Sequence, residues 1–227
     1  GVPPEYVVTT LQLDTPTLAL HMAKEQEALN RFKLRVRTYG EPGSAPVFAE
    51  VKRKFRGCIA KARAVIPYDL WSEDLVKNPL APIRFSSPKQ DAGFLEVRRL
   101  VKETLSEPYL LIRYTRESYA GHSDHYSRVT FDRNLLYQPT RSWTGFGRGG
   151  RWFQADSSLA QTHDLGYSAV VLELKTLPDA PHWMLDLIET FELERTGNCK
   201  YSTAVWREAV FRGEPQMHFE DALDFAH

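Results

Sequence analysis

The chain has 227 residues, of which 42% are hydrophobic and 26% charged, and its 29 basic and 29 acidic residues give a formal net charge of zero. This length suits one domain with a substantial core, no apolar run approaches the ~20 residues that span a membrane, and the balanced charge argues against a general nucleic-acid binder. Two cysteines exclude a disulfide framework and, with no signal peptide at the start, favour a reducing compartment, the cytoplasm.

The first part of the chain predicts a strand, a helix and then three closely spaced strands. Residues 6–14 are rich in β-branched side chains, and residues 16–31 have the apolar spacing of a helix. The three following strands are expected at 32–39, 47–55 and 58–66. A Gly/Pro/Ser loop at 40–46 and the pair Arg56-Gly57 separate them, so this region is expected to form an antiparallel meander.

The rest of the chain predicts helices, another hairpin, a long loop and a final strand. We expect helical structure in two pieces across 67–105, with Asp91 as the cap of the second piece. The other expected elements are strands at 108–116, 125–133 and 168–176, a loop at 140–166, and helices at 181–195 and 201–211. At least seven strands in mostly consecutive antiparallel pairs predict an α+β fold, an antiparallel β-barrel with helices packed outside.

Positive charge is concentrated on the three strands of the meander. Residues 31–64 hold ten Lys/Arg and two acids, whereas residues 178–227 hold four basic and ten acidic residues. A single strand of this kind usually buries one face and exposes a polar face to water. Here the three polar faces are almost all cationic, and like charges on adjacent strands repel one another. The pattern therefore indicates a polyanionic ligand that offsets the repulsion.

Few acids share these cationic faces. Glu50 and Glu173 each lie two residues before a lysine, Lys52 and Lys175, and so on the same face of their strands. Carboxylate and phosphate oxygens are the ligands that Mg²⁺ and Mn²⁺ prefer. We therefore expect a divalent metal, Mn²⁺ or Mg²⁺, beside the bound anion.

Several stretches, in this order, resemble the VTC domain, the polyphosphate polymerase domain of the triphosphate tunnel metalloenzyme (CYTH-like) superfamily. They are TLQLDT (10–15), KLRVRTYG (33–40), VFAEVKRK (47–54), IAKARA (59–64), YTRESY (114–119), RVTFDRNL (128–135), VVLELK (170–175), PHWMLDLIETFEL (181–193) and KYSTAV (200–205). The resemblance covers roughly residues 6–206, and we treat residues 1–227 as a single domain of this type. The family begins with one further strand that bears a Glu and a Lys, which residues 1–6 do not match, so we expect that strand to be missing.

The resemblance implies a closed antiparallel tunnel that holds a triphosphate, with a divalent metal on its acidic side. It implies as phosphate ligands Lys33, Arg35, Arg37, Lys52, Lys61, Arg63, Arg116, Arg128 and Lys200. Glu173 would be the main metal ligand, and Glu50 either a tunnel acid near the metal or a neighbour of the bases. The alternation of the strands picks nearly the same residues, apart from Lys200, which rests on the resemblance alone.

The activity expected is a phosphotransferase reaction in which the γ-phosphoryl group of ATP passes to a growing polyphosphate chain. Such a reaction needs positioning and neutralisation of oxygens more than covalent help from the protein. Arginine offers planar two-pronged contacts to phosphate, and lysine a mobile point charge. Two alternatives stay open: hydrolysis of triphosphate or nucleoside triphosphates, and binding of polyphosphate without turnover. No nucleic-acid partner is expected, and a membrane partner is left unassigned.

Four further features have weaker functional interpretations. His122 and His125 have the spacing of a metal pair but lie in a predicted turn. The run from Gly145 to Arg151 is expected to be a flexible loop, with phosphate binding through its N–H groups as the alternative. Helix 181–195 is expected to pack on the barrel through Trp183, Met184, Leu187, Ile188 and Phe191. The acidic tail from Glu214 to Asp224 is expected to be a solvated face that could also cap the basic site.

Overall fold

The computed structural model describes residues 5–121, 126–156 and 170–213, and the His122/His125 pair and the acidic tail lie outside these ranges. Its strands are β1 (Glu5–Asp14), β2 (Asn30–Tyr39), β3 (Val47–Phe55), β4 (Cys58–Ile66), β5 (Glu107–Ala120), β6 (Arg128–Pro139), β7 (Phe153–Gln154) and β8 (Val171–Lys175). Its helices are α1 (Ala19–Glu25), the 3-10 helix η1 (Tyr68–Leu70), α2 (Glu73–Lys77), α3 (Pro88–Thr104), α5 (His182–Thr190) and α6 (Lys200–Arg212).

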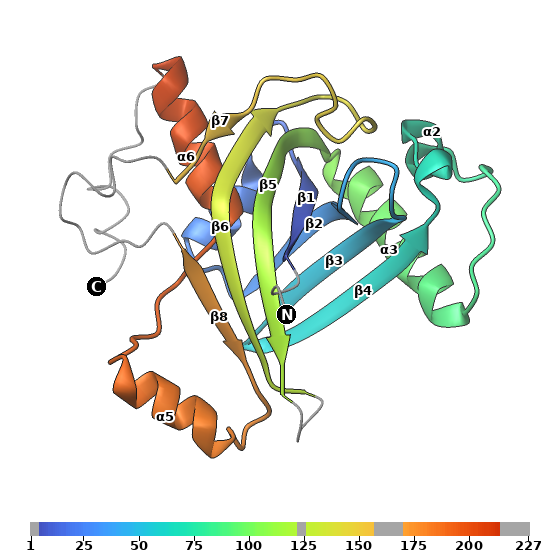
Figure 1. Ribbon diagram of the computed structural model, residues 1–227. Helices are drawn as coiled ribbons and strands as arrows, with labels where there is room; N and C mark the ends of the chain where they lie inside the picture. The colour runs from blue at the N-terminus through green and yellow to red at the C-terminus, as the bar shows by residue number, and fades with distance from the viewer. Residues whose placement is uncertain (1–4, 122–125, 157–169, 214–227) are drawn as a thin grey trace.

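The eight strands form one antiparallel sheet in the order β4-β3-β2-β1-β5-β6-β7, with β8 also paired to β6 (Figure 1). The predicted strands 47–55 and 58–66 are confirmed residue for residue as β3 and β4. The expectation of an α+β fold built on consecutive antiparallel pairs is therefore confirmed.

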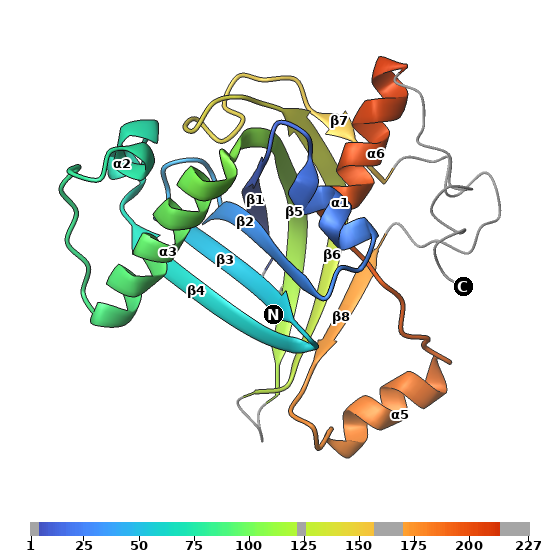
Figure 2. The same ribbon diagram turned by 180° about the vertical axis from the view of Figure 1, so that it is seen from behind.

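The prediction of a closed barrel is wrong for the described part of the chain. β4 forms one edge of the sheet, β7 and β8 both pair with β6 at the other end, and no ladder joins the two edges in these residues. The sheet is nevertheless strongly curled. In both views the turn between β3 and β4 lies beside one end of β8 (Figures 1 and 2). Closure fails because no described strand bridges the free edges of β4 and β8.

The outer, convex side of the curled sheet carries the larger hydrophobic core. Alternate side chains of β1 to β4, such as Leu11, Val36 and Val51, pack there against Phe94 and Val97 of α3. Helix α3 begins at Ser87, whose hydroxyl accepts a hydrogen bond from the Gln90 amide at 3.4 Å, so the predicted cap at Asp91 is wrong by one turn.

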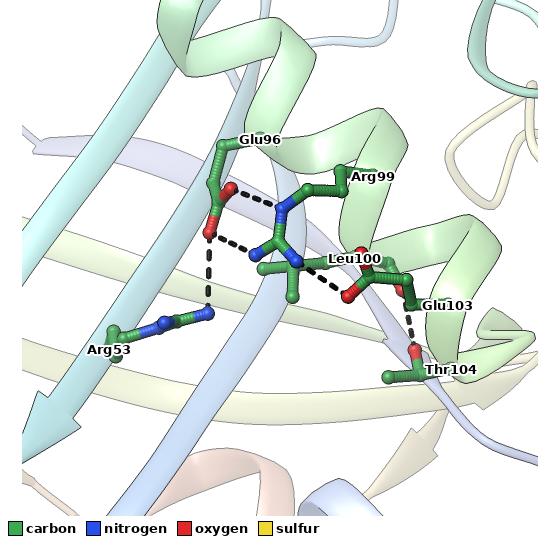
Figure 3. A network of polar contacts seen from close by, with 6 residues as sticks. All are labelled: Arg53, Glu96, Arg99, Leu100, Glu103 and Thr104. Atoms are coloured by element: carbon green, nitrogen blue, oxygen red, sulfur yellow. Dashed lines mark hydrogen bonds and ion pairs between the residues drawn. The ribbon is translucent and has the colours of Figure 1, made fainter.

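Helix α3 approaches the sheet closely at Gly93. A β-carbon there would lie 2.6 Å from the carbonyl oxygen of Arg63, so only glycine permits this packing. Polar contacts hold the same helix from its exposed flank (Figure 3): Glu96 accepts from Arg53 of β3 at 3.3 Å and from Arg99 at 2.9 Å. Arg53 is therefore committed to the convex side.

A second core fills one end of the inner, concave side. Ile112 and Tyr114 of β5 pack there with Tyr201 and Val205 of α6. The Tyr201 hydroxyl donates to Asp14 at 2.7 Å, and Asp14 also accepts from the amides of Leu20 and His21. One buried carboxylate thus ties β1, α1 and α6 together.

Two local expectations are wrong. Helix α5 stands away from the sheet (Figures 1 and 2), and of its predicted packing residues only Met184 is buried, while Phe191 just beyond it is 66% exposed. The loop expected at 140–166 contains, in its described part up to residue 156, the short strand β7, which pairs with Leu136 and Tyr137, and residues 157–166 lie outside the described ranges. Among the described residues, no helix combines the length and the hydropathy needed to cross a membrane.

Candidate anion-binding site

The register of the meander places the predicted cations in rows that cross the strands. Lys33 of β2 lies opposite Lys52 of β3, and Lys52 lies opposite Lys61 of β4. The next row runs from Arg35 through Glu50 to Arg63, and Arg37 lies one step further along β2. Partnered residues project to the same side of a sheet, and the other side is the convex core. All these side chains therefore lie on the concave face.

The same face continues across β1 onto the second half of the sheet. Tyr6 of β1 pairs with Arg116 of β5, and Arg116 pairs with Asp132 of β6. Two steps along β6, Thr130 lies opposite Glu173 of β8, and Arg128 lies opposite Lys175. The structure therefore brings all eight strand-borne cations and both carboxylates predicted from the sequence onto one concave face. We call this surface the concave site.

Lys200 reaches the concave site from the first residue of α6. Its ammonium nitrogen lies 2.7 Å from Asp132 and 4.9 Å from the centre of the Tyr114 ring. The neighbouring Cys199 accepts a hydrogen bond from the Lys33 ammonium, with 2.9 Å between Nζ and Sγ. The Lys33 charge and hydrogen bonds from Lys33 and Ser202 lower the pKa of this thiol, although burial acts to raise it. The start of α6 thus spans the concave site from β2 to β6.

Asp132 is the residue of the site that sequence reasoning missed. It is 1% exposed and accepts two hydrogen bonds from Arg116, at 2.6 and 2.7 Å. Burial acts to raise the pKa of its carboxyl, but hydrogen bonds from Arg116 and Lys200 lower it below its usual value. Its position two residues after Thr130, on the face assigned to Arg128 and Thr130, was the signal that could have found it.

Glu50 is a neighbour of the bases. One of its oxygens accepts from Arg35 Nε at 2.8 Å, and the other lies 3.5 Å from Arg63 Nε. The Arg63 guanidinium also lies 4.0 Å from the centre of the Phe48 ring. Of the two roles that the sequence left open, this geometry favours the one in which Glu50 positions two arginines.

The positive charges of the site are crowded and incompletely neutralised. Burial, and then the charges of Lys33, Arg35 and Lys61, lower the pKa of Lys52, while Glu173 acts in the opposite direction. Burial and the charge of Arg37 likewise lower the pKa of Arg35. The Nε of Arg37 is buried and has no hydrogen-bond partner in the described ranges. Unpaired buried donors are costly, so an incoming anion would gain a preorganised partner.

Lys61 and Arg128 lie at the rim of the concave site. Both are exposed, and neither forms an ion pair with any residue that the structure describes. They are therefore placed to extend the cationic surface beyond the pairs formed by Arg35 and Arg116.

The residues of the site fit a metal held mainly by substrate. No group of three Asp, Glu, His or Cys side chains suited to a metal occurs among the described residues. Glu173 is 42% exposed, and its ion pairs with described residues are longer, 3.2 Å to Lys175 and 3.5 Å to Arg116. Mg²⁺ commonly binds one or two carboxylates and completes its shell with water and phosphate oxygens. Glu173 can supply that carboxylate, whereas both oxygens of Glu50 face arginines.

The sequence profile of the VTC domain family matches residues 3–207, so the chain belongs to the VTC domain family, as the resemblance predicted. A comparison with curated protein sequences finds no match.

Two solved structures are similar to the chain at low identity. The PH1819 protein from Pyrococcus horikoshii OT3 is 12% identical with a TM-score of 0.40, over 90% of this chain and 85% of that one. A Hippeastrum protein described as a putative adenylyl cyclase with a dominant triphosphatase activity is 16% identical with a TM-score of 0.42, over 95% of this chain and 87% of that one.

Proposed function

We propose that the concave site binds a linear triphosphate or polyphosphate and that the chain transfers the γ-phosphoryl group of ATP to the end of a polyphosphate chain. In the part of the chain that the structure describes, at least ten cationic side chains share the concave site with the carboxylates of Glu50, Asp132 and Glu173, and this excess of positive charge carries the proposal. The cations are Lys33, Arg35, Arg37, Lys52, Lys61, Arg63, Arg116, Arg128, Lys175 and Lys200. Membership of the VTC domain family supports the same activity.

The arginines and the lysines of the concave site would contact the phosphate groups in different ways. Glu50 fixes Arg35 and Arg63, and Asp132 fixes Arg116, so three guanidinium groups are oriented before the anion arrives. Oriented guanidinium groups can contact phosphate oxygens in pairs, whereas Lys52 and Lys61 provide mobile charge along the chain. Preorganised positive charge of this kind stabilises the oxygens of a transferring phosphoryl group.

Glu173 would hold the Mn²⁺ or Mg²⁺ ion that the family implies, and this ion would neutralise phosphate charge when bound. Hydrolysis additionally needs a base that positions water. Both oxygens of Glu50 face arginines, which weakens the only candidate base named from the sequence. The open edge of the sheet favours one alternative, a polyphosphate-binding module without turnover.

The test is incubation with ATP and Mn²⁺ or Mg²⁺, followed by a polyphosphate-stained gel and a free-phosphate assay. We expect ADP and long chains from the wild type, and no turnover from Glu173→Gln, with tripolyphosphate affinity retained within about threefold because no cation is lost. Glu103→Gln, an exposed change on α3, is the matched control and should leave turnover intact.

Each other outcome has a definite meaning. Free phosphate without chains indicates a hydrolase. Tight tripolyphosphate binding without either product indicates the binding module. Normal turnover in Glu173→Gln would overturn the metal assignment, and absence of both binding and turnover would overturn the proposed function as a whole.

A further inference from the structure

A cavity of about 350 Å³ opens on the convex side of β5, away from the concave site. It lies between the glycine-rich run 145–150 and the turn after β2, with Glu41 and Pro42 on that second side. Arg113 enters the cavity from β5, where it pairs with Thr9 of β1. Arg113 alternates with Ile112 and Tyr114, which face the concave core. The sheet itself therefore separates this cavity from the concave site.

Arg113 is a half-buried cation held in a fixed orientation. Its guanidinium lies 4.2 Å from the centre of the Trp152 ring, Nε donates to the Thr9 hydroxyl at 3.2 Å, and Nη2 donates to the Phe146 carbonyl at 3.3 Å. A guanidinium has five N–H donors, so further donors remain for a ligand. Within the part of the chain that the structure describes, no carboxylate lies within the 4.0 Å of an ion pair with Arg113.

Arg148 adds a second cation to the same cavity. Its Nη2 donates to the Pro42 carbonyl at 2.7 Å, which ties the glycine-rich run to the turn after β2. Like Arg113, it has no carboxylate within ion-pair distance among the residues described. Glu41 also lines the cavity and offers a carboxylate at its rim.

The backbone of the run supplies additional donors. Gly145, Phe146, Gly147 and Gly149 adopt positive φ angles, whereas Arg148 and Gly150 do not. The amides of Arg148 and Gly150 are used in turns, to the carbonyls of Gly145 and Gly147. The amides of Gly147 and Gly149 have no acceptor among the described residues. A backbone in which right-handed and left-handed conformations alternate forms a concave nest of N–H groups that can bind an anion.

Packing explains one of these glycines but not the other. A β-carbon at Gly147 would lie 2.2 Å from the Trp152 ring, so this glycine is needed for contact with Trp152. A β-carbon at Gly149 would meet nothing within 4 Å. The requirement there is its positive φ of 74°, a backbone conformation that residues with a β-carbon rarely adopt.

We propose that this cavity is a second phosphoryl-binding site, in which Arg113, Arg148 and the amides of Gly147 and Gly149 hold the oxygens of one phosphate group. Among the described residues, the two guanidinium groups have no carboxylate partner and the two amides have no acceptor. All four groups are donors only, which suits a phosphoryl anion. Glu41 at the rim can accept a hydrogen bond from a hydroxyl group of the ligand. The bound phosphate group can therefore belong to free phosphate, to a polyphosphate end or to a nucleotide. The site is independent of the function proposed for the concave site.

The test is a ¹⁵N–¹H NMR titration of the full chain with orthophosphate, tripolyphosphate or ADP. We expect the Gly147 and Gly149 amides to shift in the wild type, and the ligand that saturates the shift at the lowest concentration identifies the source. Arg35→Ala, which alters the concave site, should leave these shifts unchanged. Arg148→Gln should weaken them about tenfold, because it removes one charge-assisted contact.

Arg141→Gln is the matched control, since Arg141 lies in the same segment but stacks on Tyr109. It should reproduce the wild-type titration. Absence of any shift at Gly147 and Gly149, or equal shifts in Arg148→Gln and wild type, would overturn the proposal. Loss of the shifts in Arg35→Ala would instead show that the signal comes from the concave site.

Discussion

The single carboxylate of Asp132 holds together three parts of the concave site. It is almost fully buried and neutralises both Arg116 of β5 and Lys200 of α6. Removal of one partner from a buried ion pair leaves the other charge without compensation, which costs far more than the loss of an exposed pair. Asp132 is therefore expected to matter for stability at least as much as for binding.

Asp132→Asn should lower the free energy of unfolding at pH 7 by about 3 kcal/mol, because Arg116 and Lys200 lose their buried counter-charge. The pKa of Asp132 is lowered in the folded chain, so its contribution is present above the unfolded pKa of about 3.9 and is lost as pH falls through the folded value. Urea unfolding of both proteins at pH 7 and at pH 3 measures this.

The exposed Asp186→Asn on α5 is the control and should change stability by less than about 0.5 kcal/mol. If the difference in the free energy of unfolding between wild type and Asp132→Asn is as large at pH 3 as at pH 7, the electrostatic explanation is contradicted.

At the scale of elements, the meander β2–β3–β4 combines stability on one face with binding on the other. Its convex face supplies Leu34, Val36 and Val51 to the core, and its concave face lines up Lys33, Lys52 and Lys61. Like charges placed opposite each other across strands are destabilising. The free protein is therefore expected to carry strain in this row that an anion relieves.

Lys52→Met should raise the free energy of unfolding of the ligand-free protein by about 0.5–1 kcal/mol, because it removes the central charge of the row. The stabilising shift in Tm that tripolyphosphate produces should shrink in the same variant. Arg53→Met, the next residue on the opposite face, loses only the 3.3 Å pair with Glu96 and should keep the full shift. Thermal unfolding with and without tripolyphosphate measures both effects. The prediction is contradicted if ligand-free Lys52→Met is less stable than the wild type and tripolyphosphate still raises its Tm by the full amount. The lysines of this row would then not repel one another measurably.

The same elements show how much the sequence could predict. Side chains alternate between the two faces along β3 and β4, and this period of two predicted both strands. It also predicted which side chains share a face with Lys52 and with Lys61. The pattern could not say which face is concave, because that depends on which side α3 covers. It also could not foresee that, among the described residues, most of the apolar stripe of α5 would stay uncovered and only Met184 would be buried. An apolar stripe predicts burial only when the chain brings another surface to it.

Contacts that arise only in three dimensions were beyond the sequence. The approach of Cys199 to Lys33 joins residues 166 positions apart, and the bidentate pair of Arg116 with Asp132 depends on the register between β5 and β6. Register in turn depends on the irregularity between Arg113 and Thr115, which no periodic pattern reveals. Lys200 was found only through the family resemblance, because a lysine at the start of a helix has no distinctive signal of its own.

At the scale of the whole molecule, a neutral chain becomes strongly polarised through folding. The curl of the sheet turns the cationic rows of β2 to β4 toward β5, β6 and β8. The charge of Glu173 on β8 accordingly acts to raise the pKa of Lys52 on β3. Clefts lined by charge of one sign focus the electrostatic field and attract ions of the opposite sign. The ligand that we propose, a linear polyphosphate, carries the negative charge that would neutralise these cationic rows.

The most direct test of this account is calorimetric titration of the wild type, Arg35→Ala and Arg53→Ala with tripolyphosphate. Arg35→Ala should weaken binding at the concave site at least about tenfold, because it removes a charge-assisted contact and leaves Glu50 less neutralised. Arg53→Ala removes the same charge from the convex side and should bind as the wild type does. Unchanged affinity in Arg35→Ala, or an equal loss in both variants, would contradict the claim that the concave site holds the phosphate chain.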